Sequence, residues 1–301
     1  MNPGPATQTN GASGLRAIGV IVHPSRNIDT PLRHVFDWAQ EHDVAVIQVP
    51  VLGQDRVVAD LGEAADCDLI VSIGGDGTML AAVRAAVEVD RPVLGVSCGS
   101  LGVLTAVQAD AVGSSLDRFT AGDWSARRLP ALSVAGDDGS RRFAINDVAI
   151  VRGGIGQVRV TISVDGTLFS RLAGDGAIVS TPVGSSAYSL AAGGPLLAPD
   201  TDAFLVTPLP THGGSRQPLV VGARSELVLE VSAGVGGARL ELDGQLATDE
   251  PQELRIGMRP AVATLVAFAE QDSLFDALRR RRIIVDSPRL VADDERAASR
   301  A

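Results

Sequence analysis

Two glycine-rich segments carry the side chains best suited to chemistry. The first, Ile73-Gly74-Gly75-Asp76-Gly77-Thr78, follows an apolar run that predicts a strand and opens a stretch that predicts a helix. Glycines let the backbone approach a ligand there, and the free N–H groups of a helix start attract phosphate. A carboxylate at such a place suits proton abstraction from a hydroxyl nucleophile, or metal binding. The segment predicts phosphoryl transfer to a hydroxyl; alternatively, Asp76 or Thr78 only caps the helix.

The second segment, GDGAIVSTPVGSSAYSLAAGGP at 174–195, places small hydroxyl residues and glycines between a predicted strand and a predicted helix. Short donors and acceptors of this kind suit a ribose and an adenine. Tyr188, the single tyrosine of the chain, can pack on a ring or hydrogen-bond through its hydroxyl. Composition alone equally allows an ordinary turn that leads into an Ala-rich helix.

The order of residues in the second segment resembles the DG-x-x-x-STPTGSTAY-x-x-x-AGGP element of the NAD kinase family. The first segment resembles the GGDGT loop that NAD kinases share with phosphofructokinases and with diacylglycerol and sphingosine kinases. Other stretches are similar to family elements, so that the resemblance runs from about residue 17 to 267: GVSCGSLGVLT at 95–105, AINDVAI at 144–150, residues 202–221, and Asp243-Gly244-Gln245.

The resemblance implies a kinase that uses ATP to phosphorylate the 2′-hydroxyl of the adenosine ribose of NAD, with NADH as a further acceptor. It implies Asp76 as the catalytic group and Mg²⁺ as the divalent metal with ATP. The implied NAD-binding residues are Gly77, Asn146, Asp147, Asp175, Ser186, Ala187, Tyr188 and Gln245. The resemblance also implies a homodimer or homotetramer.

The donor phosphates are expected on Gly74, Gly75, Thr78 and Arg26. Arg26 belongs to a His-Pro-Ser-Arg run that follows the first predicted strand, at the sheet edge where ligands bind in such folds; the alternative is an ordinary turn. The run 279–282 is four arginines, which could meet phosphate or an acidic neighbour, or form a solvated helix end. No residue is assigned as a metal ligand.

Several positions depart from the family's pattern, and they leave two alternatives open. A lipid or sugar kinase could use the same GGDGT loop, and a dinucleotide-binding regulator could have weakened catalysis. Because Asp76, Asn146 and Asp175 are all present, we expect an active enzyme. The departures are Ser97 for Asn, Val103 for Phe, Asp147 for Glu, Ala173 for Arg, Val183 for Thr or Ser, Ser186 for Thr and Gln217 for Arg.

The elements that must position these residues fall into two classes. Apolar strands predicted at 17–22, 44–49, 69–73 and 92–96 alternate with helices predicted at 31–42, 57–65 and 79–89. This alternation indicates an α/β domain with a parallel sheet, Rossmann-like and phosphofructokinase-like. From residue 125, the pattern changes to short β runs, among them 158–164, 176–181 and 238–242. Turn pairs at 137–139, 165–166 and 243–244 separate such runs, and together they predict an antiparallel all-β domain, a β-sandwich.

We therefore expect an α/β nucleotide-binding domain at 15–124 and a β-rich NAD-binding domain at 125–267. A strand predicted at 261–267 and a helix at 273–281 close the chain, and the segment 268–290 should pack back on the α/β domain. Residues 1–14 and 291–301 are expected to be disordered tails.

Composition narrows the function classes further. The net charge is −10, which disfavours a nucleic-acid partner. All 26 basic residues are Arg, so no lysine can bind a phosphate. Two cysteines without metal-type spacing favour a reducing cytoplasm. The N-terminus lacks the pattern of a signal peptide, and no apolar run reaches the ~18 residues of a membrane span, so no membrane partner is expected.

Overall fold

The computed structural model describes residues 14–99, 102–105, 107–137, 139–214, 216–249, 252–271 and 273–298. The chain divides into two compact units, Met1–Arg127 with Leu265–Ala301, and Arg128–Thr264. The domain boundaries predicted at 124/125 and 267/268 lie close to these divisions. Except for Gly14, the predicted N-terminal tail lies outside the described residues.

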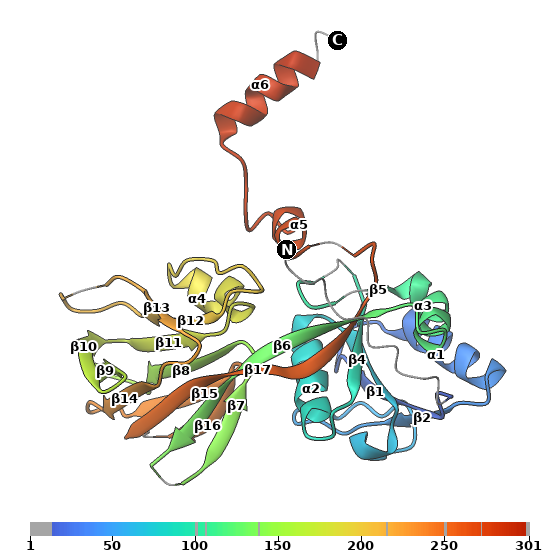
Figure 1. The fold of residues 1–301 in the computed structure, drawn as a ribbon, viewed down its shortest axis with the longest axis horizontal. Coiled ribbons are helices and arrows are strands. Elements are labelled where there is room, and N and C mark those ends of the chain that lie inside the picture. The colour runs from blue at the N-terminus through green and yellow to red at the C-terminus, as the bar shows by residue number, and fades with distance from the viewer. Residues whose placement is uncertain are drawn as a thin grey trace, which may run out of the picture. The chain divides into compact units, whose positions relative to one another are not determined.

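The first unit holds a parallel sheet in the order β5-β4-β3-β1-β2 (Figure 1). Its strands are β1 (Ala17–Val22), β2 (Ala45–Gln48), β3 (Leu69–Gly74), β4 (Pro92–Ser97) and β5 (Val107–Gln108). Its helices include α1 (Asp29–Glu41), α2 (Asp76–Val87) and α3 (Val112–Thr120), with short 3-10 turns η1 (Ala64–Asp66) and η2 (Ala109–Ala111). The four strands predicted from apolar runs are confirmed, each to within a residue or two.

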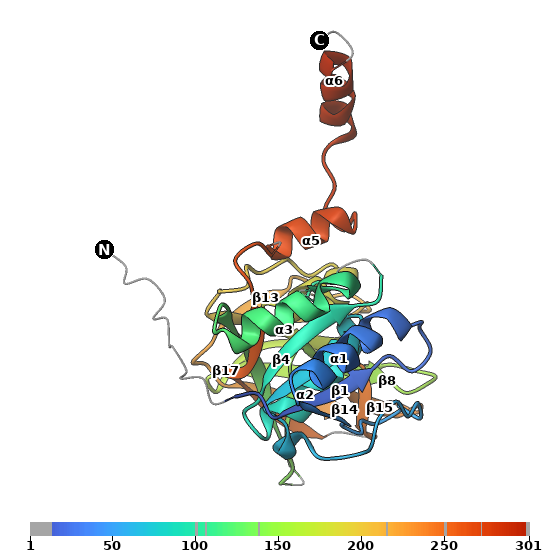
Figure 2. The same ribbon diagram turned by 90° about the vertical axis from the view of Figure 1, so that its right-hand side faces the viewer.

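Helices cover both faces of this sheet. Alternate residues of β1, Ile18, Val20 and Val22, share one core with side chains of α1 and α3, and Figure 2 shows these two helices on the same side of β1. On the opposite face, α2 packs on β3 and β4, where a side chain at Gly95 would press on Met79. Because both faces are covered, residues of both faces of β1, β3 and β4 are buried and most of them are apolar.

The helix predicted at 57–65 is wrong. The segment is irregular and contains only the 3-10 turn η1. The side chain of Gln48 explains this, because its Nε2 donates to Arg56 O at 2.6 Å and its Oε1 accepts from Val58 N at 2.7 Å. These bonds hold the segment along the edge of β2, and tertiary contacts thereby override a local helical pattern.

The second unit is built from two antiparallel sheets. One has the order β13-β12-β11-β8-β15-β16, and the other contains β10-β9-β14-β17 with β6 and β7. The strands are β6 (Ser125–Gly136), β7 (Arg141–Ala144), β8 (Asp147–Arg152), β9 (Val158–Val164), β10 (Thr167–Gly174), β11 (Gly176–Ser180), β12 (Ala203–Pro208), β13 (Leu219–Gly222), β14 (Leu227–Ser232), β15 (Ala238–Leu242), β16 (Gln245–Asp249) and β17 (Glu253–Ala267).

One apolar core joins the two sheets of this unit. It contains Val148 and Ile150 of β8 together with Ile162 of β9 and Leu229 of β14, so the predicted β-sandwich is confirmed. The hairpin turns Asp165-Gly166 and Asp243-Gly244 have positive φ at both residues, 48° and 76° in the first and 49° and 75° in the second. Asp-Gly is the residue pair that such turns favour. In the predicted turn 137–139, Asp138 lies outside the described residues.

The C-terminal segment begins with β17, which starts in the second unit and ends in the first. Helix α5 (Leu274–Arg280) follows, with a capping box between Ser273 and Asp276. Helix α6 (Pro288–Ala298) occupies most of the stretch that we expected to be a disordered tail. Apolar residues and charged residues each recur there at helical spacing, and this pattern favours a helix. Among the described residues, no helix combines the length and the apolar character that crossing a membrane requires.

Candidate functional site

Asp76 is the first residue of α2 and directly follows the sharp turn out of β3. A Cβ added to Gly74 would lie 2.3 Å from Oγ1 of the buried Thr78, so this turn closes only with glycine. Met79 N donates to Gly75 O at 2.9 Å. The N–H groups of residues 76–78 therefore precede the hydrogen-bond ladder of the helix and are oriented to receive an anion.

Two of the described residues donate hydrogen bonds to the Asp76 carboxylate. Leu104 N donates to Oδ1 at 3.0 Å, and Arg281 Nη1 donates to Oδ2 at 2.8 Å. The loop that carries Leu104 lies directly on this carboxylate, because a Cβ at Gly102 would stand 2.1 Å from Asp76 Oδ1. Asp76 keeps 28% of its side chain exposed. The carboxylate is therefore held in one orientation and still open to a ligand.

A turn after β1 brings cations beside the glycine loop. His23 Nδ1 accepts from Ser25 N at 3.2 Å and from Arg26 N at 3.1 Å, and burial together with Arg26 and Arg56 lowers the pKa of His23. A Cβ at Gly75 would lie 3.7 Å from Arg26 Nη1, and Arg56 Nη1 donates to Arg26 O at 2.7 Å. The Arg26 guanidinium therefore lies near the loop, in a position that suits phosphate oxygens, and the Arg56 guanidinium lies next to the Arg26 backbone.

In the second unit, Asn146 and Asp147 are fixed by a carboxylate from the β15–β16 turn. Asp243 accepts from Ile145 N at 3.0 Å, from Asn146 N at 2.7 Å and from Asp147 N at 3.1 Å. Asn146 Oδ1 is buried and has no hydrogen-bond partner among the described residues. A buried acceptor without a donor is unfavourable, so this oxygen is suited to accept a hydrogen bond from a ligand.

Asp147 is almost completely buried, with 5% of its surface exposed. Burial, with smaller contributions from Asp243 and Glu241, raises its pKa to about 7. The sequence alone suggested a carboxylate that keeps the charge of the usual glutamate. Near neutral pH, however, this side chain is partly protonated, and in that form it can donate a hydrogen bond.

The glycine- and serine-rich segment folds against Asn146 as the 3-10 turn η3 (Gly184–Ser186) and the short helix α4 (Tyr188–Ala191). A Cβ at Gly184 would lie 1.9 Å from Asn146 O, so the two motifs touch through their backbones. Ser186 Oγ donates to Val183 O at 2.8 Å, and Val183 is buried. Ala187 and Tyr188 are exposed. The segment therefore presents Ala187 and Tyr188 to a ligand from a rigid turn.

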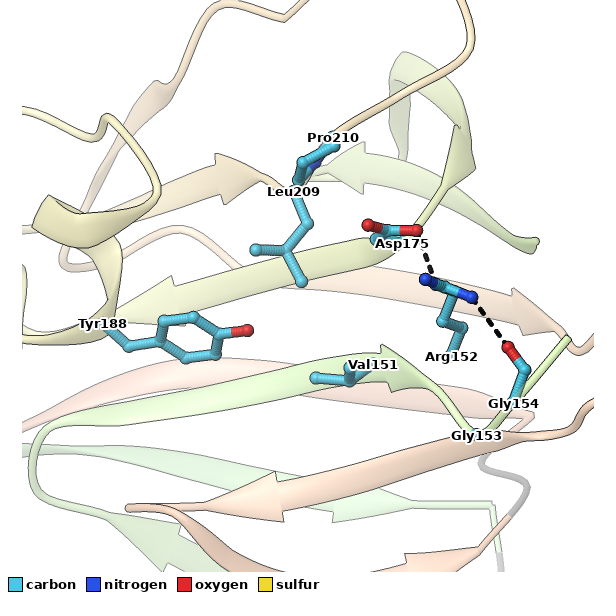
Figure 3. A pocket seen from close by; sticks show the side chains of 8 residues that line it. All are labelled: Val151, Arg152, Gly153, Gly154, Asp175, Tyr188, Leu209 and Pro210. Carbon is cyan, nitrogen blue, oxygen red and sulfur yellow. Dashed lines mark hydrogen bonds and ion pairs between the residues drawn. The ribbon is translucent and has the colours of Figure 1, made fainter. Parts of the chain in front are cut away.

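Tyr188 borders a cavity of about 400 Å³ within the second unit (Figure 3). Arg152 Nε lies 2.6 Å from Asp175 Oδ1, and its Nη1 donates to Gly154 O at 2.8 Å. Burial, then Glu241, Asp147 and Asp175, raises the pKa of Tyr188, so its hydroxyl stays protonated. The cavity lining is Val151, Arg152, Gly153, Gly154, Asp175, Tyr188, Leu209 and Pro210.

Sequence profiles match both units. The ATP-NAD kinase N-terminal domain matches residues 18–124, and the ATP-NAD kinase C-terminal domain matches residues 145–267. An NAD kinase of Desulforamulus reducens is 30% identical over 280 residues, which cover 89% of this chain and 97% of that protein. The NAD kinase of Symbiobacterium thermophilum is 36% identical over 242 residues, 76% of this chain and 84% of that protein. The chain belongs to the ATP-NAD kinase family.

Solved structures of NAD kinases share the fold. Yeast NADH kinase, complexed with NADH, has a TM-score of 0.74 at 21% identity, covering 91% of this chain and 89% of that one. An NAD kinase from Archaeoglobus fulgidus in complex with ATP has a TM-score of 0.71 at 23% identity, covering 89% and 100%. These structures confirm the predicted fold class. The domain profiles and the named relatives confirm the predicted family and NAD kinase activity and give the lipid or sugar kinase alternative no support.

The structure also shows polar residues that our sequence reasoning had not assigned to an NAD kinase site. Arg56, Arg152 and Arg281 contact, or lie beside, predicted site residues, and Asp243 orients two of them. The Asp-Gly turn was a usable signal for Asp243, since its carboxylate lies at the tip of a hairpin. Gln245, predicted to bind NAD, lies exposed in β16, and Gly77 is exposed in the first turn of α2.

A divalent metal ion accompanies ATP in this family, so the next question is which side chains of this chain could bind such an ion. Among the described residues, no group of three or more His, Cys, Asp or Glu side chains could hold a metal ion. Mg²⁺ commonly takes one or two carboxylates and completes its shell with water and substrate phosphates. The single carboxylate of Asp76 beside the glycine loop fits this second arrangement, in which the metal arrives with ATP.

Proposed function

We propose that this chain transfers the γ-phosphoryl group of ATP to the 2′-hydroxyl of the adenosine ribose of NAD and so makes NADP. The observation that carries the proposal is the position of Asp76, at the start of α2. Its carboxylate is oriented by Leu104 and Arg281 and lies beside the free N–H groups of a glycine loop. One group can thus receive a proton while its neighbours hold phosphate.

The donor phosphates belong on the loop Gly74–Thr78. Its backbone N–H groups and the positive end of the α2 dipole attract them, and Arg26 and Arg56 add two guanidinium groups nearby. Arginine is the cation available for this task, because the chain contains no lysine. Its planar fork can bond two phosphate oxygens at once.

The acceptor dinucleotide belongs on the second unit. The unpartnered Asn146 Oδ1 can accept from an adenine amino group or a ribose hydroxyl, and partly protonated Asp147 can donate to or accept from ribose. Tyr188, 40% exposed, offers a ring to stack on and a protonated hydroxyl. Asp175 and Arg152 at the cavity would meet the nicotinamide end. Ser186 and Ala187 shape the adenine contact.

In the reaction, the ribose 2′-oxygen attacks the γ-phosphorus, and its bond to the oxygen that bridges to the β-phosphorus breaks. Asp76 takes the hydroxyl proton, and ADP leaves with the bridging oxygen. The helix N–H groups and Arg26 hold the phosphate oxygens in position for in-line attack. Asp76 is the side chain that would hold a Mg²⁺ ion bound with ATP, and that ion would neutralise the phosphate charge.

One experiment tests this proposal. The purified chain is incubated with NAD, ATP and Mg²⁺, and NADP is measured with an NADP-specific dehydrogenase. We expect turnover by the wild type and a loss of kcat of at least about 10²-fold in Asp76→Asn, with NAD binding retained. Absence of NADP while the dinucleotide still binds would favour the regulator alternative. Parallel reactions with NADH and with polyphosphate would identify the acceptor and donor ranges.

We also propose a cytoplasmic location and a homodimer or homotetramer. Both cysteines, Cys67 and Cys98, are free thiols, which agrees with a reducing compartment. Light scattering of the purified chain would measure the oligomer, and a monomer at working concentrations would contradict that part of the proposal.

A further inference from the structure

Arg281 reaches Asp76 from the other end of the chain. Its Nη1 donates to Asp76 Oδ2 at 2.8 Å, and 205 residues separate the two. Both residues belong to the first unit. The sequence offered three readings of the arginine run that contains Arg281, of which a solvated helix end was one. In the structure, Arg279 pairs with Asp286, and Arg281 pairs with Asp76, the aspartate that we propose as the catalytic base.

The position of Arg281 is fixed by the helix that precedes it. Helix α5 starts at the capping box and buries Leu274 and Leu278, which are 5% and 0% exposed. Arg281 N donates to Ala277 O at 3.1 Å, and Ile283 N donates back to Leu278 O at 2.9 Å. This second bond closes the helix end, with Arg282 at φ 57°. The backbone of Arg281 is therefore held in place beside the glycine loop.

Charge gives this contact a further role. A triphosphate on the glycine loop brings several negative charges next to the Asp76 carboxylate, and the two anions repel each other. A guanidinium carries five N–H donors in a planar fork, and the bond to Asp76 involves Nη1. The other N–H groups belong to the same guanidinium, and they can donate hydrogen bonds to the oxygens of a phosphoryl group that lies against Asp76. Arg281 is 39% exposed, so a ligand can reach it.

We propose that Arg281 is a catalytic residue that binds the γ-phosphoryl group during its transfer from ATP to the ribose. This role rests on the proposed function. In the resting enzyme it pairs with Asp76. In the reaction it stays protonated and donates N–H groups to the γ-phosphoryl oxygens while the ribose oxygen bonds to phosphorus. The bond to the bridging oxygen breaks, its electron pair leaves with ADP, and the hydroxyl proton passes to Asp76. Arg281 stabilises the equatorial negative charge, as an arginine supplied by the same chain.

The test compares Arg281→Ala and Arg281→Lys with the matched control Arg280→Ala, which removes the same charge from an exposed position one residue earlier. Steady-state kcat and KM, NAD affinity by titration calorimetry and urea unfolding are measured for each full-length variant. We expect kcat to fall about 10²- to 10³-fold in Arg281→Ala, and KM for NAD to stay within about threefold. Arg281→Lys keeps the charge without the fork and should lie between.

Guanidinium at sub-denaturing concentration provides a second readout. It should restore part of kcat to Arg281→Ala and leave Arg280→Ala unchanged, which a merely structural role would not produce. If kcat for Arg281→Ala equals that of the control or exceeds that of the wild type, the role of Arg281 is refuted. The proposed function would still stand in that case, because the wild type turns over. A wild type that makes no NADP from any dinucleotide would refute the proposed function and this role together.

Discussion

Asp147 should make the stability of this protein depend on pH in an unusual direction. Its pKa rises from 3.8 to about 7 on folding, so the folded state binds more protons than the unfolded state between those values. Stability therefore falls as pH rises through this window and has lost the whole contribution above the folded pKa. Most carboxylates do the opposite, because ion pairs and hydrogen bonds lower their pKa values in folded proteins.

The magnitude follows from the linkage relation. With the two pKa values above, the contribution of Asp147 becomes less favourable by roughly 2 to 3 kcal/mol between pH 5 and pH 8. The side chain is 5% exposed, so solvent screens this effect little. Glu241 and Asp243 are the charges that raise the pKa further, and both lie next to it in the folded state.

The assay is urea unfolding of the wild type and of Asp147→Asn at pH 5 and at pH 8. The asparagine carries no titrating proton, so the variant should gain stability relative to the wild type as pH rises, by roughly 2 to 3 kcal/mol. Asp200→Asn is the control, because Asp200 lies exposed in the same unit, and its difference from the wild type should stay flat. A pH-independent difference for Asp147→Asn would refute the reasoning.

Three other predictions use the same site. Asp243→Ala should destabilise the protein by about 3 kcal/mol in urea unfolding, whereas Asp243→Asn should cost only about 1, because the amide oxygen can still accept two of the three N–H bonds; equal losses would contradict this. Arg152→Ala should change stability by under ~1 kcal/mol, since its pair with Asp175 is partly exposed, yet raise KM for NAD several-fold; an unchanged KM would remove Arg152 from the site. EDTA should stop NADP formation without weakening NAD binding, and Mg²⁺ should restore it; turnover in EDTA would exclude a metal-dependent donor.

Local patterns predicted much of this fold because the relevant forces act between sequence neighbours. Short β runs at 158–164, 176–181 and 238–242 predicted β9, β11 and β15, and Asp-Gly pairs predicted two of the hairpin turns. Helix α3 and strands β10, β13 and β16 were missed, since their sequences are more polar or shorter than the patterns require. The helix predicted at 57–65 failed for a different reason, because the Gln48 side chain holds that segment.

The sequence alone predicted phosphoryl transfer at Asp76 and its glycine loop and identified the family, because both inferences depend on the order of residues along short stretches. The charges that surround those residues come from distant parts of the chain and are known from the folded structure. Arg281 lies 205 residues from Asp76, and Asp243 lies 97 residues from Asn146. The raised pKa of Asp147 likewise depends on burial and on neighbours from β15 and its turn. Burial and long-range charge contacts exist only once the chain has folded, so no local pattern encodes them.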